Sequence, residues 1–87
     1  MPEVSLFFGI IIAMFAKDHV PPHFHAKYGE FKATIDINTG ELLDGNLLRR
    51  AIRLVQDWAE LHKEELIENW VESQKNNPDI KPIEPLS

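Results

Sequence analysis

The sequence predicts a small α+β domain, in which an antiparallel β-meander of three or four strands carries one long helix on one face. Apolar and polar residues alternate over residues 23–38, which is the period of a half-buried strand. Over residues 47–74 the apolar residues instead recur every three or four positions, which is the period of an amphipathic helix. A chain of 87 residues has room for one hydrophobic core.

The first predicted element is a strand within an apolar run. Residues 6–15 are continuously apolar, with several β-branched and aromatic side chains, and such a run is typical of a strand buried on both faces. We expect Gly9 to bend this strand. Pro21 and Pro22 then disfavour helix and keep the chain extended up to the next element.

A hairpin is predicted over residues 24–37, with its turn at Gly29-Glu30. Glycine at the first loop position fits a two-residue type II′ turn. The turn sets a register in which the apolar residues share the face toward the helix and the histidines the opposite face. The predicted pairs are Tyr28 with Phe31, Ala26 with Ala33, Phe24 with Ile35, His25 with Thr34, and His23 with Asp36.

After a second turn at residues 38–40, we expect a short edge strand at residues 41–43 and then the long helix. A helix of this length spans about 40 Å at ~1.5 Å per residue, which exceeds the reach of the short strands. It must therefore overhang, bend or pack against a second protomer. An overhang that exposes Trp70 predicts an interface, either in a homodimer or with a partner protein.

The chain is expected to form one α+β domain over residues 1–75. Residues 76–87 contain three prolines and are interpreted as a C-terminal tail, either extended or disordered.

Composition restricts the possible partners. The 14 acidic residues outnumber the 9 basic ones, for a net charge of −5, which disfavours nucleic acid and favours a cation or a basic protein. The absence of cysteine excludes disulfides and cysteine-ligated zinc. The apolar run is too short to cross a bilayer and follows Glu3 instead of a basic segment, so we expect a cytoplasmic protein with no membrane partner.

Three of the four histidines lie close together in the sequence. His23 and His25 alternate along one strand and project from the same face, about 6.5–7 Å apart at the backbone. His19 approaches from the proline-stiffened loop, and Asp36 is the predicted cross-strand neighbour of His23. Nitrogen ligands and a carboxylate suit a divalent ion, zinc above all, so His19, His23 and His25 are the candidate metal ligands.

The same residues allow other interpretations. His23 and His25 could act as catalytic general acid and base, with Asp36 orienting one ring, while Lys27 and Lys32 attract a phosphate-bearing substrate. The stretch could also be a recognition loop, or a set of exposed polar residues without a function. His62 lies in the apolar stripe of the helix and is interpreted as a core histidine.

The segment Asp18-His19-Val20-Pro21-Pro22-His23-Phe24-His25-Ala26 resembles a bacterial family of small proteins classed as a domain of unknown function. Its His-x-Pro-Pro-His-Phe-His motif is the most specific part of the likeness. Further similar segments lie at residues 8–10, 28–30, 44–47 and 58–62. The resemblance implies a cytoplasmic prokaryotic protein that is often genetically paired with another small uncharacterised protein, as toxins are with antitoxins.

Two functional hypotheses follow. In the first, the histidine cluster binds metal or phosphate, and the chain is the toxin-like member of a two-protein system that acts on RNA or other phosphoesters. In the second, the chain is a non-catalytic interaction module or the neutralising partner, and its histidines are structural. The acidic charge favours the second hypothesis, and the cluster of histidines favours the first.

Overall fold

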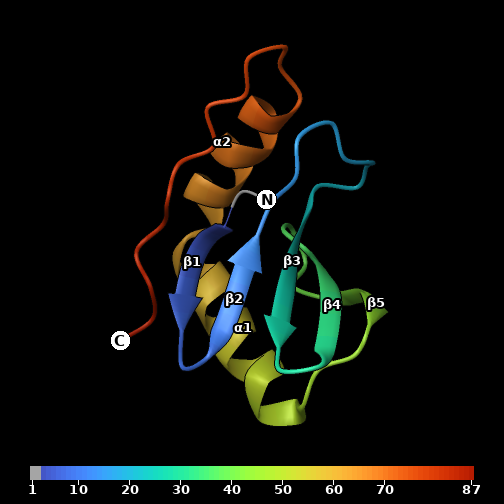
Figure 1. Cartoon of the computed structure of the whole chain (residues 1–87), viewed down its shortest axis with the longest axis vertical. Coiled ribbons are helices and arrows are strands. Elements are labelled where there is room, and N and C mark those ends of the chain that lie inside the picture. The colour runs from blue at the N-terminus through green and yellow to red at the C-terminus, as the bar shows by residue number, and fades with distance from the viewer. Residues whose placement is uncertain (1–2) are drawn as a thin grey trace.

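The structure is a computed structural model that describes residues 3–87. Within these residues, five antiparallel strands lie in the sheet in the same order as in the chain, and two helices follow them (Figure 1). This confirms an antiparallel α+β architecture and corrects the predicted numbers of strands and helices. The elements are β1 (Glu3–Phe7), β2 (Ile10–Ala13), β3 (His23–Tyr28), β4 (Phe31–Asp36), β5 (Leu42–Gly45), α1 (Arg49–Leu61) and α2 (Lys63–Ser73).

The apolar run near the start of the chain forms a hairpin, not the single bent strand that was predicted. Strands β1 and β2 pair with Leu6 opposite Ile11 and Phe7 opposite Ile10. Phe8 and Gly9 have φ values of 50° and 79°, and two positive φ values in succession are characteristic of a type I′ turn. The sequence did not predict this turn, because its first position is aromatic and aromatic residues are typical of strands.

The β3–β4 hairpin has the predicted register, from His23 opposite Asp36 to Tyr28 opposite Phe31. Gly29 has a φ of 60°, as the first central residue of a type II′ turn requires. The face that carries Phe24 and Ile35 is buried, with both side chains at most 1% exposed. His25 and Lys27 alternate with these residues and therefore lie on the other face.

The strand β5 ends at Gly45, where the backbones of the paired strands β4 and β5 approach closely. Gly45 has a φ of 79°, and a Cβ atom built there would lie 2.2 Å from the carbonyl oxygen of Lys32. Only glycine combines this backbone conformation with such a close contact.

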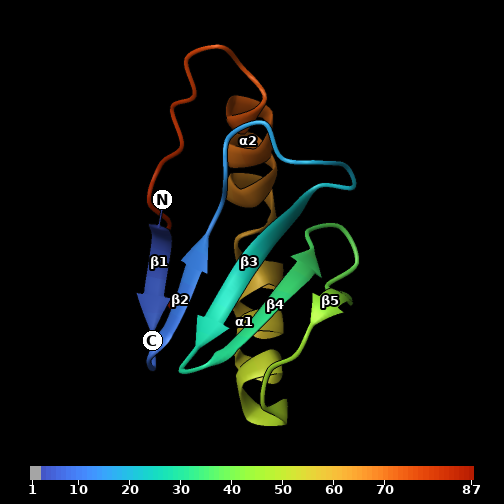
Figure 2. The same cartoon turned by 45° about the vertical axis from the view of Figure 1, so that its right-hand side comes forward.

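The predicted long helix is divided at His62, which has φ −117° and ψ 25°. Backbone hydrogen bonds from His62 N to Trp58 O and from Leu66 N to His62 O span the break at 3.1 and 2.9 Å. The two helices therefore follow one another along the same face of the sheet (Figure 2). Trp58 and Leu66 are completely buried beneath them, so the bend keeps both helices in contact with the core.

The C-terminal segment is an extended arm that packs beside β1 (Figure 1). Ile83 is 4% exposed, and its N–H donates to the carbonyl of Val4 at 2.7 Å. The indole of Trp58 donates to the carbonyl of Glu84 at 2.8 Å. Of the two alternatives for residues 76–87, the structure therefore shows the extended arm. Across the described residues, neither helix has the length and apolar character needed to cross a membrane.

Candidate functional site

The loop between β2 and β3 is held in place at both ends. Lys17, whose φ is 60°, donates from its backbone N–H to the carbonyl of Ser73 at 2.8 Å and from Nζ to the carbonyl of Gln74 at 2.9 Å. At the other end, the carbonyl of Pro22 accepts a hydrogen bond from the N–H of Ile37 at 3.0 Å. The loop is thus tied to the C-terminal end of α2 and to the end of β4.

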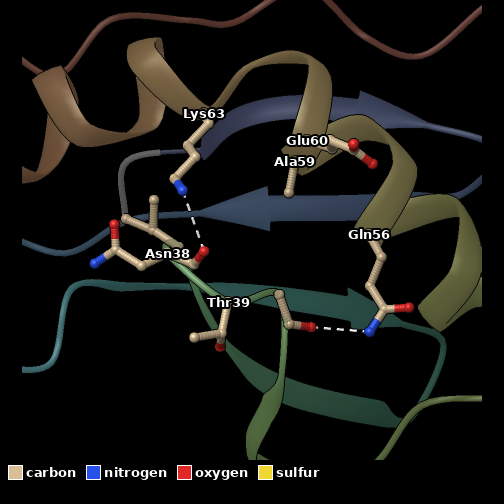
Figure 3. A pocket seen from close by; sticks show the side chains of 8 residues that line it. Asn38, Thr39, Gln56, Ala59, Glu60 and Lys63 are labelled. Carbon is tan, nitrogen blue, oxygen red and sulfur yellow. Dashed lines mark hydrogen bonds between the residues drawn. The ribbon is translucent and has the colours of Figure 1, made fainter.

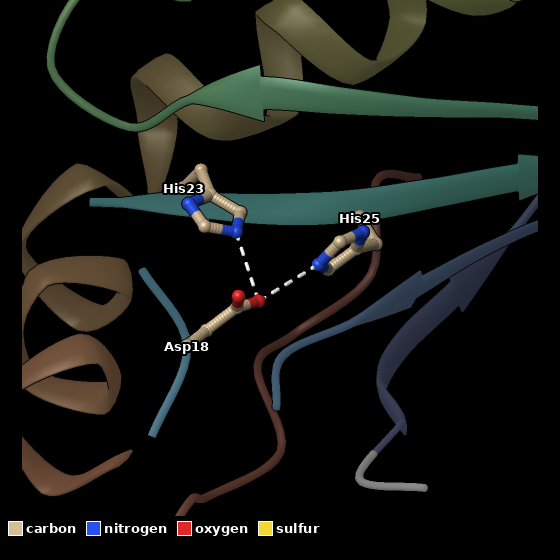
Figure 4. Close-up of side chains that lie close together, drawn as sticks. All are labelled: Asp18, His23 and His25. Atoms are coloured by element: carbon tan, nitrogen blue, oxygen red, sulfur yellow. Dashed lines mark hydrogen bonds and ion pairs between the residues drawn. The ribbon is translucent and has the colours of Figure 1, made fainter. Parts of the chain in front are cut away.

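This anchoring places Asp18 over the first residues of β3 (Figure 4). Its Oδ2 lies 2.9 Å from Nε2 of His23 and 3.0 Å from Nε2 of His25. One ligand atom from each of the three residues lies within 4.8 Å of the other two. Two imidazoles and a carboxylate therefore converge on one point.

The side chain of His23 is held more tightly than the sequence predicts. It is 8% exposed, and its ring lies 5.2 Å from that of Trp70 on α2. The burial of Trp70 in its own chain removes the observation that pointed to an interface at this residue. Because α2 covers His23, His23 is not one of a set of exposed polar residues, which was one interpretation of the sequence.

The protonation of His23 follows from its neighbours. Its Nδ1 lies 2.7 Å from the carbonyl oxygen of Pro21, which can only accept, so Nδ1 carries a hydrogen. In a neutral imidazole the other nitrogen is then a bare lone pair. The Nε2 lone pair would face the carboxylate of Asp18, and two acceptors repel each other. The contact therefore requires a second proton on His23 or a cation between the two groups.

His25 forms the more open side of the cluster. Its side chain is 33% exposed, its ring packs edge-to-face against Phe15 at 4.6 Å, and the hydroxyl of Thr34 lies 3.4 Å from its Nδ1. Since a hydroxyl can donate, a neutral His25 can keep its hydrogen on Nε2 and donate it to Asp18. A ligand could reach the cluster from this side.

Asp18 is an ionised carboxylate at neutral pH. Burial raises its pKa, but hydrogen bonds from His25, from the backbone N–H of His19 and from His23 outweigh this effect, helped by the charge of His23. Together they lower the pKa of Asp18 from 3.8 to about 2. The side chain is thus available as an anionic ligand or as the partner of a protonated histidine.

Two residues proposed from the sequence lie outside this cluster. His19 is exposed, and its contact with Asp18 is made by its backbone N–H, at 2.9 Å from Oδ1. Asp36 lies opposite His23 in the ladder, but its Oδ1 accepts hydrogen bonds from the N–H groups of Asn38 and Thr39 at 2.7 and 3.0 Å. Its carboxylate therefore stabilises the turn after β4, as aspartate often does in turns.

Asp18 was not among the residues proposed from the sequence. The available signal was its position beside His19, in the loop that leads into the His-x-His strand. A carboxylate within reach of two histidines on one strand face is a candidate ligand wherever the loop folds back. Sequence spacing alone does not show that this loop returns over β3.

Apart from the cluster, a hollow of about 480 Å³ lies between the loop after β4 and the helix α1 (Figure 3). Two of its polar side chains, Gln56 and Lys63, already have partners in the protein. Gln56 donates to the carbonyl of Gly40 at 2.8 Å, and Lys63 donates to that of Asn38 at 3.2 Å. These bonds hold the loop to the helix, so the hollow offers less chemistry than the Asp18–His23–His25 cluster.

His62 also has a partner of its own. It lies at the junction of the two helices, where its Nδ1 is 2.6 Å from a carboxylate oxygen of Glu65 and its ring is 5.6 Å from that of Trp58. Its side chain is 17% exposed. These contacts account for His62 at the edge of the core, apart from the cluster on β3.

The comparisons with known proteins identify a family. The family model described as a domain of unknown function, DUF4160, matches residues 9–71, a segment that includes all three residues of the cluster. Comparison with curated proteins and with solved structures found no match. Because the family model covers most of its length, the chain belongs to the DUF4160 family.

Proposed function

We propose that this protein binds a first-row divalent metal ion, with zinc the expected ion, through Asp18 Oδ2, His23 Nε2 and His25 Nε2. The observation that carries the proposal is the convergence of three ligand atoms, two of which would face each other as acceptors when His23 is neutral. The hydrogen bond from His23 Nδ1 to Pro21 directs the lone pair of Nε2 at the Asp18 carboxylate, 2.9 Å away. A bound cation would convert this repulsion into two metal–ligand bonds.

The distances suit such an ion after a small adjustment. Zinc binds imidazole nitrogen and carboxylate oxygen at about 2.0–2.2 Å, so two ligands of a tetrahedral site are roughly 3.3 Å apart. The two contacts of Asp18 are 2.9 and 3.0 Å. A movement of a few tenths of an ångström would bring both contacts of Asp18 to this spacing. The bond from His23 Nδ1 to the Pro21 carbonyl is the kind of outer contact that orients metal-binding histidines.

The number of ligands bears on the role of the ion. Structural zinc sites are usually closed by four protein ligands, whereas catalytic sites use three and leave a position for water or substrate. The cluster supplies three ligand atoms, and His25 is its open side. A zinc ion in such a site lowers the pKa of bound water and so supplies a nucleophile for phosphoester hydrolysis.

We therefore propose RNA or another phosphoester as the substrate class. The role as the toxin-like member of a two-protein system, in the cytoplasm, is supported by the resemblance of the histidine motif and not by the fold. Its partner protein is expected to be small. Co-expression of the chain with the product of the adjacent gene, followed by size-exclusion chromatography, tests this pairing, and separate elution of the two proteins would contradict it.

A structural role is the alternative that the geometry also favours. A protonated His23 could pair with Asp18 and pin the loop to the sheet without any metal. The tight packing of His23 against Trp70 favours this alternative, because it gives the ring a function in the fold. In that case the second functional hypothesis, an interaction module without catalysis, applies.

Calorimetric titration with zinc separates the two alternatives. We expect one ion per chain for the native protein, and at least tenfold weaker binding for Asp18→Asn and for His25→Ala. The matched control is His19→Ala, which removes an exposed histidine of the same motif and leaves binding unchanged. His23→Ala is a poor probe, because His23 is buried and its loss destabilises the fold. The absence of zinc binding to the native protein would favour the structural role.

A further inference from the structure

A second feature adjoins the cluster on the outer face of the sheet, the face that the helices leave uncovered. It is a hollow of about 140 Å³ whose wall includes His25. Its volume is below that of typical pockets for drug-sized ligands, about 300–1,000 Å³, so it fits a small molecule or one group of a larger one. It is lined by Ile11, Ala13, Phe15, His25, Ala26, Lys27 and Lys32.

Two lysines that line the hollow face each other. Lys27 and Lys32 are direct partners in the β3–β4 ladder, and both are exposed. Like charges directly opposite each other in a ladder destabilise the pairing. Among residues 3–87, neither ammonium group has a carboxylate within 4.0 Å. A bound anion between them would relieve this repulsion.

The rest of the lining is mostly apolar. It includes Ile11 and Phe15, and the ring of Phe15 also packs against His25. A ligand that fits this lining and the lysines has an anionic group and a small apolar or aromatic body. Lysine binds phosphate as a point charge, so phosphate is the best match for the pair. The net charge of −5 favours a small anion over a polyanion.

We propose that this hollow binds a small phosphate monoester with an apolar body. The phosphate lies between the ammonium groups of Lys27 and Lys32, and the body lies on Ile11 and Phe15. Lys27 is two residues from His25 on the same strand, so the backbone positions of the two residues are about 6.6 Å apart. The proposal names the substrate class of the proposed metal site, and its relevance to catalysis rests on that proposed function.

The test is a titration of the isotope-labelled protein with phenyl phosphate, followed by amide NMR shifts. In the presence of a chelator, we expect saturable shifts on β2, β3 and the first half of β4. The variant with both Lys27→Gln and Lys32→Gln should bind at least tenfold more weakly. It should fold normally, because the substitutions remove a repulsion at exposed positions. The control is Lys81→Gln, an exposed lysine on the C-terminal arm, which should bind like the native protein.

The proposal would be overturned by the absence of saturable shifts in the native protein, by shifts confined to another surface, or by equal binding of the doubly substituted variant. Inorganic phosphate should bind more weakly than phenyl phosphate, and equal affinity would contradict the apolar half of the site. A single-stranded RNA oligonucleotide forms the third arm. If it binds more tightly than phenyl phosphate, with affinity that falls steeply with salt, the ligand is a nucleic-acid backbone and the small-molecule proposal fails.

Titrations with zinc and with phenyl phosphate distinguish the proposed metal site from the proposed phosphate site. If zinc binds and phenyl phosphate does not, the metal site stands and the hollow is not a phosphate site. If phenyl phosphate binds through the lysines in chelator and zinc never binds, the phosphate site stands and the metal site fails. Asp18→Asn lies in the cluster and not among the residues that line the hollow, so it should weaken zinc binding at least tenfold.

Discussion

Replacing Asp18 by asparagine tests whether its carboxylate holds the β2–β3 loop to the sheet. The native side chain is 18% exposed. It accepts hydrogen bonds from the N–H of His19 and from Nε2 of His25 and, when His23 carries its second proton, a third from Nε2 of His23. Asparagine is nearly isosteric and can keep the bond from His19, but it has no charge and cannot accept from both rings. Hydrogen bonds to charged groups contribute about 1.5–3 kcal/mol each when they are fully buried.

Partial exposure to solvent reduces that contribution, so we expect Asp18→Asn to lower the free energy of unfolding by about 1–2 kcal/mol near pH 6. The difference should depend on pH. The pKa of Asp18 is about 2 in the folded protein and about 3.9 in an unfolded chain. Its contribution is therefore complete above about pH 4 and is lost as the pH falls through about 2.

Urea unfolding of both proteins in chelator, at several pH values between 6 and 2, measures this dependence. The free-energy difference should be constant from pH 6 to pH 4 and then shrink toward zero. Asp79→Asn is the control, since Asp79 is exposed and 3.9 Å from its nearest basic group, and it should change stability by less than about 0.5 kcal/mol. A difference that persists unchanged to pH 2, or no destabilisation at pH 6, would refute the reasoning.

Two further predictions concern the scaffold, and both are measured by urea unfolding. Gly45→Ala should lower the free energy of unfolding by roughly 3 kcal/mol, because a left-handed backbone and an overlap with Lys32 O at 2.2 Å add together. Gly40→Ala, at a similar φ but with nothing within 4 Å, should lower it by about 1 kcal/mol. Equal losses of stability would contradict the close approach at Gly45. Ile83→Ala should lower the free energy of unfolding by about 2–3 kcal/mol, because Ile83 is 4% exposed. A loss below about 0.5 kcal/mol would show that the arm does not pack on β1.

The parts of the fold that were predictable depend on local periodicity. The β3–β4 register follows from one glycine turn and a strict alternation, and the structure confirms every predicted pair from His23–Asp36 to Tyr28–Phe31. The β1–β2 turn was missed because Phe8 occupies a position with positive φ that glycine or asparagine usually takes. A bend was one of the three outcomes expected from the length of the helix, but its position at His62 was not predicted because the apolar stripe continues through it.

The candidate site was half predictable. The face shared by His23 and His25 follows from strand geometry, whereas their carboxylate partner depends on where a nine-residue loop, residues 14–22, folds back. That path is set by long-range contacts such as Lys17 N to Ser73 O, which no local pattern reveals. Cross-strand proximity was also a poor guide to contact, since Asp36 faces His23 in the ladder but turns its carboxylate to the following loop.

The most direct test of the metal proposal is long-range proton–nitrogen NMR of the four histidine rings during titration with zinc. We expect Nε2 of His23 and Nε2 of His25 to shift together and to saturate at one ion per chain. The Nδ1 of His23 should remain protonated through its bond to Pro21, and the rings of His19 and His62 should be unaffected. Saturable shifts at His19 or His62, or no saturable shift at His23 and His25, would contradict the proposed metal centre.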